Sequence, residues 1–374
     1  MKAILSKINQ VLVSANPQQA QRKLKSATRS SKKMTAAENG AVATADGAKK
    51  RKTEDAVEAV EHKGFGKLIL FGEHFVVYKK PALVGAVKAA TVAEVELSPE
   101  GVWSQGLIVE DDRPAVPGYK DKKAEEMFES TRLVLKHFDL DSNKRGVKVI
   151  LKGDLAPVSG IGASAANCVS VARALAAALG KEVDEDEINQ AAYEGEMAYH
   201  GTPSGIDNTA STFGGVLRFQ RTDDKPLFDK KKLPVEIPIV YASSGITSST
   251  TEVVGDVRAK READMAWYEA LEKEYMEIFD EAEKAISEGG DDLVKTLAAL
   301  ADRNHAVCQK LTVSCKELDD LVDTARAAGA LGAKMSGTGR GGLMFAICAD
   351  EAAQEKVAEA LSKTAAHVWK TSFQ

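Results

Sequence analysis

A glycine-punctuated loop that leads into a helix-forming segment is the most informative chemical feature of this sequence. Residues 154–167 read Asp-Leu-Ala-Pro-Val-Ser-Gly-Ile-Gly-Ala-Ser-Ala-Ala-Asn. Gly160 and Gly162 allow a tight turn and close approach to a ligand, and the free N–H groups at a helix start attract phosphate. The pattern is neither a Walker loop nor the GxGxxG fingerprint. Alone, it is equally typical of an ordinary helix cap.

Two carboxylates flank the next break in the helical pattern. Glu196 lies near the end of a predicted helix, and the Gly-Thr-Pro-Ser-Gly stretch at 201–205 ends that helix and places Asp207 on a tight loop. Phosphoryl transfer needs one carboxylate for Mg²⁺ and another near the acceptor hydroxyl, because catalysis is mostly positioning and charge neutralisation. Ser164 can add a hydroxyl ligand to the metal. The alternatives are an Asx-turn at Asp207 and a Glu196 on the surface.

Two further segments carry weaker signals. Lys67 precedes a short apolar strand, and Glu73 and His74 come just past the end of that strand. This pattern fits a lysine held in a cleft, but by itself it favours a structural ion pair. Residues 334–342 form a glycine-rich turn between a helix and a strand, which indicates only that the backbone passes close to other backbone or to a ligand.

Helical and strand-like segments follow one another without strict βαβ alternation. Alternating or continuous apolar runs predict strands, and longer amphipathic stretches predict helices. The predicted strands are 67–71, 91–97, 147–151, 216–219, 238–241, 343–348 and 367–370, and the predicted helices are 163–179, 185–199, 251–287, further patterns up to 328, and 351–365. This order favours an α+β architecture over a doubly wound sheet.

The chain is predicted to have three parts, at residues 1–62, 63–230 and 231–374. The first is a basic extension that we expect to be disordered, with no Asp or Glu before residue 38. Its composition also fits an organellar (mitochondrial) transit peptide, and its basic run at 49–52 fits a nuclear-localisation signal. A cytoplasmic location is expected, with organellar import as the alternative. The boundary between the two lobes is placed near 225–234, where charges and two prolines interrupt the pattern.

Composition limits the classes of function. The chain has 374 residues, 44% hydrophobic and 28% charged, which is enough for a sizeable core. A formal net charge of −5 gives no overall nucleic-acid footprint. No stretch approaches the roughly 20 apolar residues of a membrane span. The four cysteines match neither a zinc site nor a disulfide framework.

Together, the order and spacing of the four segments resemble the GHMP kinases over residues 64–374. The family's middle motif, a proline followed by Gly-Leu-Gly-Ser-Ser-Ala, is similar to residues 157–165. Within the family, residues 72–78, 81–83, 203–208 and 246–251 look like the members that phosphorylate mevalonate, and 159–164 is similar to kinetoplastid members.

The resemblance implies a two-lobed α+β fold. The first, ATP-binding lobe would contain a left-handed βαβ crossover, the second lobe would be ferredoxin-like, and the active site would lie in the cleft. The implied reaction transfers the γ-phosphoryl group of ATP, with Mg²⁺, to the primary hydroxyl of mevalonate in isoprenoid precursor biosynthesis. No nucleic-acid partner is expected, and homodimers are common among relatives.

The resemblance also implies a role for each matching residue. Asp207 would be the catalytic base or would orient the acceptor hydroxyl, with Lys67 beside it. Ser164 and Glu196 would ligate Mg²⁺. His74 and Thr250 would lie near mevalonate, with Glu73 in support. The residues that would wrap the phosphates are Val158, Ser159, Gly160, Ile161, Gly162, Ala163 and Ser164.

Four departures from the family pattern affect binding contacts. Ala163 replaces the first serine of the usual pair, and Gly153 stands where relatives often carry a serine. Arg340 interrupts the glycine run of the last motif, and Ser248 stands where animal enzymes carry an arginine.

Two alternatives to a mevalonate-phosphorylating enzyme stay open. A GHMP kinase acting on phosphomevalonate needs additional cationic side chains in the acceptor pocket, and a sugar kinase is a further option. A catalytically silent sensor with this fold predicts loss of Asp207, Lys67 or a metal ligand, and all of these residues are present.

Overall fold

The computed structural model describes residues 62–99, 106–158 and 160–374, which belong to one compact unit. The extension predicted at 1–62 lies outside the described residues, apart from His62. Within the part of the chain that the structure describes, none of the helices combines the length and the apolar character that a membrane span needs.

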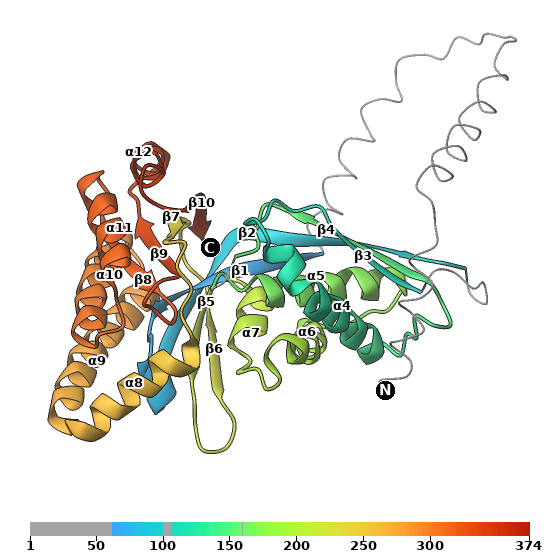
Figure 1. Cartoon of the computed structure of the whole chain (residues 1–374), viewed down its shortest axis with the longest axis horizontal. Coiled ribbons are helices and arrows are strands. Elements are labelled where there is room, and N and C mark those ends of the chain that lie inside the picture. The colour runs from blue at the N-terminus through green and yellow to red at the C-terminus, as the bar shows by residue number, and fades with distance from the viewer. Residues whose placement is uncertain (1–61, 100–105, 159) are drawn as a thin grey trace, which may run out of the picture. The chain divides into compact units, whose positions relative to one another are not determined.

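A ten-stranded mixed sheet runs through this unit (Figure 1). Its strands are β1 (Lys63–Phe71), β2 (Ala82–Leu97), β3 (Leu107–Asp111), β4 (Val147–Gly153), β5 (Val216–Gln220), β6 (Leu227–Lys231), β7 (Ile237–Ser243), β8 (Gly332–Ser336), β9 (Leu343–Ile347) and β10 (His367–Phe373). The order is β3-β4-β2-β10-β7-β9-β8, with β1 and β5 also paired to β2, and β6 paired to β5. The long strand β2 is therefore the hub of the sheet.

Helices pack against both ends of the sheet. They are α4 (Tyr119–His137), α5 (Ala163–Ala178), α6 (Glu185–His200), α7 (Ile206–Phe213), α8 (Thr250–Ala263), α9 (Met265–Glu288), α10 (Leu293–Lys310), α11 (Lys316–Ala327) and α12 (Glu351–Leu361), with a short 3₁₀ helix at Phe75–Tyr78. Figure 1 shows α4–α7 gathered at one end and α8–α12 at the other.

The C-terminal half has the ferredoxin-like arrangement that the family resemblance implies. Its strands are connected as β7, helices α8–α11, β8, β9, α12 and β10, and they pair antiparallel in the order β10-β7-β9-β8. In the N-terminal half, β3 and β4 are parallel and α4 connects them. The α+β class is confirmed. The left-handed sense of the βαβ crossover in the first lobe stays a prediction.

The predicted elements are present, with several additions. The sequence did not predict β3, β6, β8, α4 or α7. The predicted single helix at 251–287 is two helices, because Asp264 ends α8 and its side chain accepts a hydrogen bond from the Trp267 N–H at the start of α9. Strand β6 occupies part of the predicted interruption at 225–234 and pairs with β5. The division into lobes at residue 230 stays a prediction.

The position of β8 depends on a glycine. A Cβ at Gly332 would lie 2.0 Å from the carbonyl oxygen of Ala298 in α10. Gly332→Ala should therefore push β8 away from α10 and lower the free energy of unfolding by about 2 kcal/mol or more. Gly255→Ala is the matched control: Gly255 is exposed on α8 with nothing within 4 Å of a new Cβ, so this change should stabilise by about 0.5–1 kcal/mol. Urea denaturation of both variants tests the pair, and equal stability would contradict the packing described.

Candidate active site

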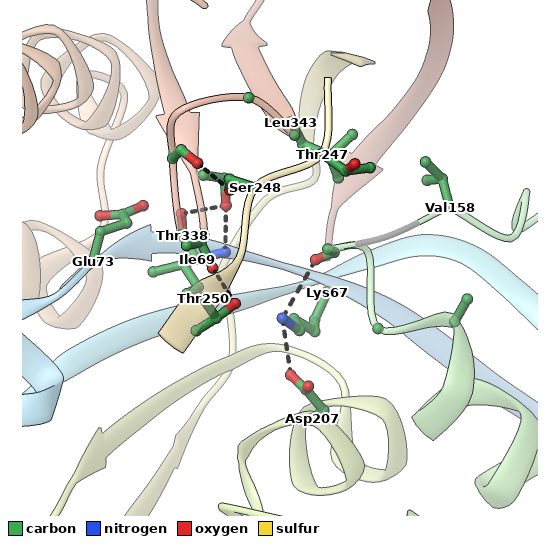
Figure 2. A pocket seen from close by; sticks show the side chains of 18 of the residues that line it. Lys67, Ile69, Glu73, Val158, Asp207, Thr247, Ser248, Thr250, Thr338 and Leu343 are labelled. Carbon is green, nitrogen blue, oxygen red and sulfur yellow. Dashed lines mark hydrogen bonds and ion pairs between the residues drawn. The ribbon is translucent and has the colours of Figure 1, made fainter. Parts of the chain in front are cut away.

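A cavity of about 480 Å³ brings together residues from all four segments that the sequence analysis selected (Figure 2). Among the residues predicted for the site, Lys67, Glu73, His74, Val158, Gly160, Gly162, Ala163, Ser164, Asp207 and Thr250 line this cavity. Ile161 points into the core and is fully buried. Ser159 lies outside the described residues. Glu196 is buried beside Ser164 and Asp207.

Lys67 and Asp207 form an ion pair in the cavity. Lys67 Nζ lies 2.9 Å from Asp207 Oδ1 and 3.4 Å from the Gly160 carbonyl oxygen. Figure 2 shows Lys67 and Asp207 pointing toward each other. The lysine side chain is 10% exposed and the aspartate 32% exposed, so the carboxylate still faces the cavity. The pair joins β1 to the first turn of α7.

The local structure around this pair differs from the sequence prediction in two respects. Lys67 lies inside β1, not before it, and its N–H donates to the Ile161 carbonyl at 2.8 Å. Asp207 was predicted on a loop, but it lies in the first turn of α7 because Gly205, with φ of 83°, starts the helix immediately after the break. A carboxylate in the first turn of a helix is favoured by the helix dipole.

The glycine loop leaves the start of α5 open. Gly162 is the N-cap residue of α5 with φ of 76°, and as a glycine it has no side chain to cap this end. Gly160 also has a positive φ, of 100°. A Cβ at Gly162 would lie 3.0 Å from Lys67 Cγ, so a side chain there would press against the catalytic lysine candidate. The uncapped N-terminus beside an open cavity suits a phosphate group.

Glu196 is a buried carboxylate near a second carboxylate. It is 1% exposed, and the Ser164 hydroxyl donates a hydrogen bond to it. Burial and the nearby charge of Asp207 raise the pKa of Glu196 to about 8. Oxygen or nitrogen atoms of Glu196, His200 and Asp207 lie within 4.8 Å of one another. Because Glu196 is buried, the alternative of a Glu196 on the surface is wrong. The two neighbouring carboxylates of Glu196 and Asp207 fit a divalent cation with oxygen ligands.

Glu73 is engaged in a buried ion pair with Lys334 of β8. Both side chains are fully buried, and Lys334 Nζ also donates to the carbonyl oxygens of Met335 at 2.8 Å and Ile69 at 3.3 Å. Burial raises the pKa of Glu73, and Lys334 opposes that shift. Through its ion pair with Lys334, Glu73 joins the turn after β1 to β8, and both of these segments contribute residues to the cavity wall.

His74 and Thr250 meet at the glycine-rich turn after β8. His74 Nε2 donates to the Thr338 carbonyl oxygen at 2.7 Å, and the hydroxyls of Thr250 and Thr338 are 2.9 Å apart. Burial lowers the pKa of His74, which keeps the ring neutral. Its Nδ1 atom is buried and has no hydrogen-bond partner in the described part of the chain.

Lys334, Thr338 and His200 are among the residues of the site that carried no predicted role. Lys334 and Thr338 lie in the glycine-rich segment that the sequence analysis singled out. A lysine in an otherwise buried strand is the signal that could have marked Lys334, since such a side chain needs a partner. His200 lies one helical turn after Glu196, the spacing that places two side chains on one face.

Comparisons with known proteins agree with this geometry. The family model for the GHMP kinases N terminal domain matches residues 126–215, and that for GHMP kinases C terminal matches residues 282–367. The mevalonate kinase of Thermococcus gammatolerans is 33% identical over 310 residues, which cover 79% of this chain and 90% of that protein. The chain belongs to the GHMP kinase family.

Other GHMP kinases are similar in sequence or in structure. The mevalonate kinase of Pyrococcus horikoshii is 34% identical over 308 residues, covering 79% of this chain and 90% of that protein. The crystal structure of L. major mevalonate kinase in complex with R-mevalonate is 38% identical, with a TM-score of 0.79, and covers 84% of this chain and 95% of that chain. Lactococcus lactis galactokinase, at 18% identity and a TM-score of 0.60, covers 86% of this chain and 97% of that chain and shares the fold.

The buried Glu73–Lys334 pair predicts a specific pattern of stability changes. Lys334→Met leaves a buried carboxylate without its partner and should lower the free energy of unfolding by about 3–5 kcal/mol. Adding Glu73→Gln removes the unpaired charge, so the double variant should recover part of that loss. Chemical denaturation of the single variants and the double variant measures the coupling. Additive losses would show that the two side chains act independently.

The raised pKa of Glu196 predicts a pH-dependent stability in the absence of divalent ions. The folded state holds a proton on Glu196 up to about pH 8, whereas the unfolded chain releases it near the ordinary value of 4.5. The contribution of this bound proton to the free energy of unfolding is complete below pH 4.5. It is lost as the pH rises from there through 8. The Glu196→Gln variant has no such proton to lose. Its free energy of unfolding, relative to that of the wild type, should therefore increase by about 1 kcal/mol or more between pH 5 and pH 8.

Thermal unfolding across this pH range tests the Glu196 prediction. Glu182→Gln is the control, because Glu182 is exposed on the connection between α5 and α6. The melting temperature of Glu182→Gln should change with pH in parallel with that of the wild type. If the Glu196→Gln profile is also parallel, Glu196 is ionised in the folded protein and the assigned protonation state is wrong.

Proposed function

We propose that this GHMP kinase transfers the γ-phosphoryl group of ATP to the primary hydroxyl of mevalonate, giving 5-phosphomevalonate and ADP. The observation that carries the proposal is the Lys67–Asp207 pair, which faces the same cavity as the uncapped start of α5. The identity of 38% to an enzyme crystallised with R-mevalonate supports this choice of acceptor.

The phosphates of ATP would lie at the N-terminus of α5. Backbone N–H groups of the loop formed by Val158, Ser159, Gly160, Ile161, Gly162, Ala163 and Ser164 would bind them. This contact suits a polyanion because the donors point outward from the helix start and carry its positive dipole end. The buried side chain of Ile161 anchors the loop to the core, which keeps these donors in place.

Asp207 would accept the proton of the acceptor hydroxyl. As the proton moves to its carboxylate, the hydroxyl oxygen forms a bond to the γ-phosphorus and the bond to the β–γ bridging oxygen breaks, releasing ADP. Lys67 Nζ, 2.9 Å from Asp207, orients the carboxylate and stabilises negative charge on the acceptor oxygen.

The donor set also fits Mg²⁺. Ser164 and Glu196 would hold the ion, with the Asp207 carboxylate close by. Mg²⁺ would neutralise the charge that develops on the transferred phosphoryl group and its leaving oxygen. Ion binding requires Glu196 to lose its proton.

The acceptor side of the cavity suits a hydroxylated monocarboxylate better than a phosphorylated one. His74, Thr250 and Thr338 line this side of the cavity, and the two threonines present hydroxyl groups. Among the described residues, the lysines and arginines that line the cavity are Lys67 and Lys123. A second phosphate on the acceptor would need more cations than this, which disfavours phosphomevalonate.

Three wider expectations belong to the same proposal. Residues 63–230 would form the ATP-binding lobe and residues 231–374 the second lobe. A homodimer is expected from the family resemblance. A cytoplasmic location is expected, and import directed by the N-terminal extension is the alternative.

A coupled ADP-release assay with ATP and Mg²⁺ tests the proposal. Turnover should be rapid with mevalonate and absent with phosphomevalonate, galactose and homoserine. Asp207→Asn should keep ATP binding and lose about 10²–10⁴-fold in kcat, the usual contribution of a general base. Asp223→Asn, a change of the same chemistry at an exposed position, should leave kcat unaltered. Turnover on another acceptor alone, or unchanged turnover in Asp207→Asn, would contradict the proposal.

A further inference from the structure

Residues with left-handed backbone conformations cluster beside the acceptor side of the cavity. Among the described non-glycine residues, positive φ angles occur at His74, Lys79, Asp139, Thr312 and Arg340. Three of these five, His74, Thr312 and Arg340, meet at the glycine-rich loop 337–342. Such conformations are unfavourable for residues with a Cβ and persist only where surrounding contacts impose them. Their concentration here indicates a loop held in a required shape.

Arg340 is the residue that departs from the glycine run of this loop. Its φ is 52°, between Gly339 and Gly341, which also have positive φ. Neither neighbour has room for a side chain: a Cβ would lie 1.9 Å from the Val313 carbonyl oxygen at Gly339 and 2.6 Å from that of Ile246 at Gly341. At position 340 the side chain has space, and glycine would relieve the backbone strain. What the arginine adds at this position, compared with a glycine, is its side-chain contacts.

The contacts of Arg340 join three elements. Its guanidinium forms an ion pair with Asp256 of α8 and donates through Nε to the Thr312 carbonyl at 3.3 Å. Its backbone N–H donates to the Val313 carbonyl at 2.8 Å. Lys260, one helical turn beyond Asp256, also reaches Thr312, through its hydroxyl at 2.7 Å. Arg340 thus fastens the loop between α8 and the connection from α10 to α11.

The same loop carries the groups that shape the acceptor side. The Thr338 carbonyl receives the His74 Nε2–H at 2.7 Å, and the Thr338 hydroxyl lies 2.9 Å from that of Thr250. Ser248 donates to the Gly339 carbonyl at 2.6 Å. Figure 2 shows Thr250 directed toward Thr338. A shift of the loop relative to α8 would therefore break the contact between Thr338 and Thr250 and move the carbonyl that orients His74.

We propose that Arg340 is a positioning residue for the acceptor: by locking loop 337–342 to Asp256 of α8, it holds Thr338 where it orients His74 and Thr250. The inference rests on the proposed function for the identity of the acceptor. Arg340 acts through Thr338 and does not line the cavity.

The electrostatics of His74 support the same arrangement. Burial and the Arg340 charge lower the pKa of His74, and the hydrogen bond to Thr338 opposes them. The other charged pair close to His74 in the chain is Glu73–Lys334, in which each side chain neutralises the other. Without Arg340, the pKa of His74 should rise, and the loss of kcat/KM at acid pH should begin at a higher pH.

Steady-state kinetics of four variants test the positioning role. Arg340→Ala should raise the KM for mevalonate about threefold to fivefold, the upper part of the range expected for a partly exposed ion pair, with kcat and the KM for ATP within about twofold. Arg340→Lys should restore most of the loss. Asp256→Asn should resemble Arg340→Ala, and the double variant should be no worse than either single variant, because both remove the same contact. An unchanged mevalonate KM, or an equal rise in the KM for ATP, would overturn the proposal.

A second measurement does not depend on the acceptor. The chain has six histidines, and the His74 ring signal can be assigned by NMR as the one missing from His74→Gln. Its pKa should rise in Arg340→Ala and stay near the wild-type value in Arg340→Lys. If the wild type does not phosphorylate mevalonate, the proposed function fails, but the titration still decides whether Arg340 acts on His74. An unmoved His74 pKa in Arg340→Ala would overturn the inference even if the function holds.

Discussion

The buried ion pair between Glu73 and Lys334 is the interaction on which the arrangement of the site depends. Glu73 follows β1 in the N-terminal half, and Lys334 lies in β8 of the C-terminal half, so one contact with no exposure to solvent joins two segments 261 residues apart. Removing either partner leaves a charge in the interior, which costs far more than a lost surface pair. The pair therefore sets how the turn after β1, which carries His74, meets the turn after β8, which carries Thr338.

The balance of charged side chains around Asp207 determines the chemistry of the cavity. Lys67 pairs with Asp207, while Glu196 lies close enough to Asp207 for the two carboxylates to disfavour simultaneous ionisation. Lys67 and Lys123, the lysines that line the cavity, carry too little positive charge to neutralise both carboxylates and the phosphates of a nucleotide. In the proposed reaction a divalent cation and the backbone N–H groups of α5 would complete the balance, and this would account for a Glu196 that is buried beside Ser164.

The sequence predicted the local chemistry of the site better than its tertiary partners. The glycines of the α5 loop, the carboxylates at 196 and 207 and the Lys67 strand were found because their spacing reflects the neighbouring backbone. The partners of Glu73 and His74 lie more than 260 residues away, and no local pattern records such contacts. Asp207 was placed on a loop because the proline and glycines before it indicate a break, whereas the eight-residue helix that follows is too short for a clear periodicity. Length alone does not explain why β6 and β8 were missed, because β5 and β9 are also five residues long and were predicted. Strand β6 is mostly exposed and β8 begins with a glycine and contains a lysine, so neither has the apolar pattern of a strand.

The continuity of the sheet limits how the cavity can open. Strand β10 pairs with β7 along its length and reaches β2 at Phe373, whose ring lies against Gly85. A rigid-body hinge between the two halves would have to break this junction. Loop 337–342, residues 246–249 and α8 form the wall of the cavity beside this junction, and they are joined by backbone hydrogen bonds from Gly342 to Ile246 and from Arg340 to Val313 as well as by side-chain contacts. Any widening of the cavity on this side would therefore have to part these contacts, and it would not follow from a rotation of one half of the sheet against the other.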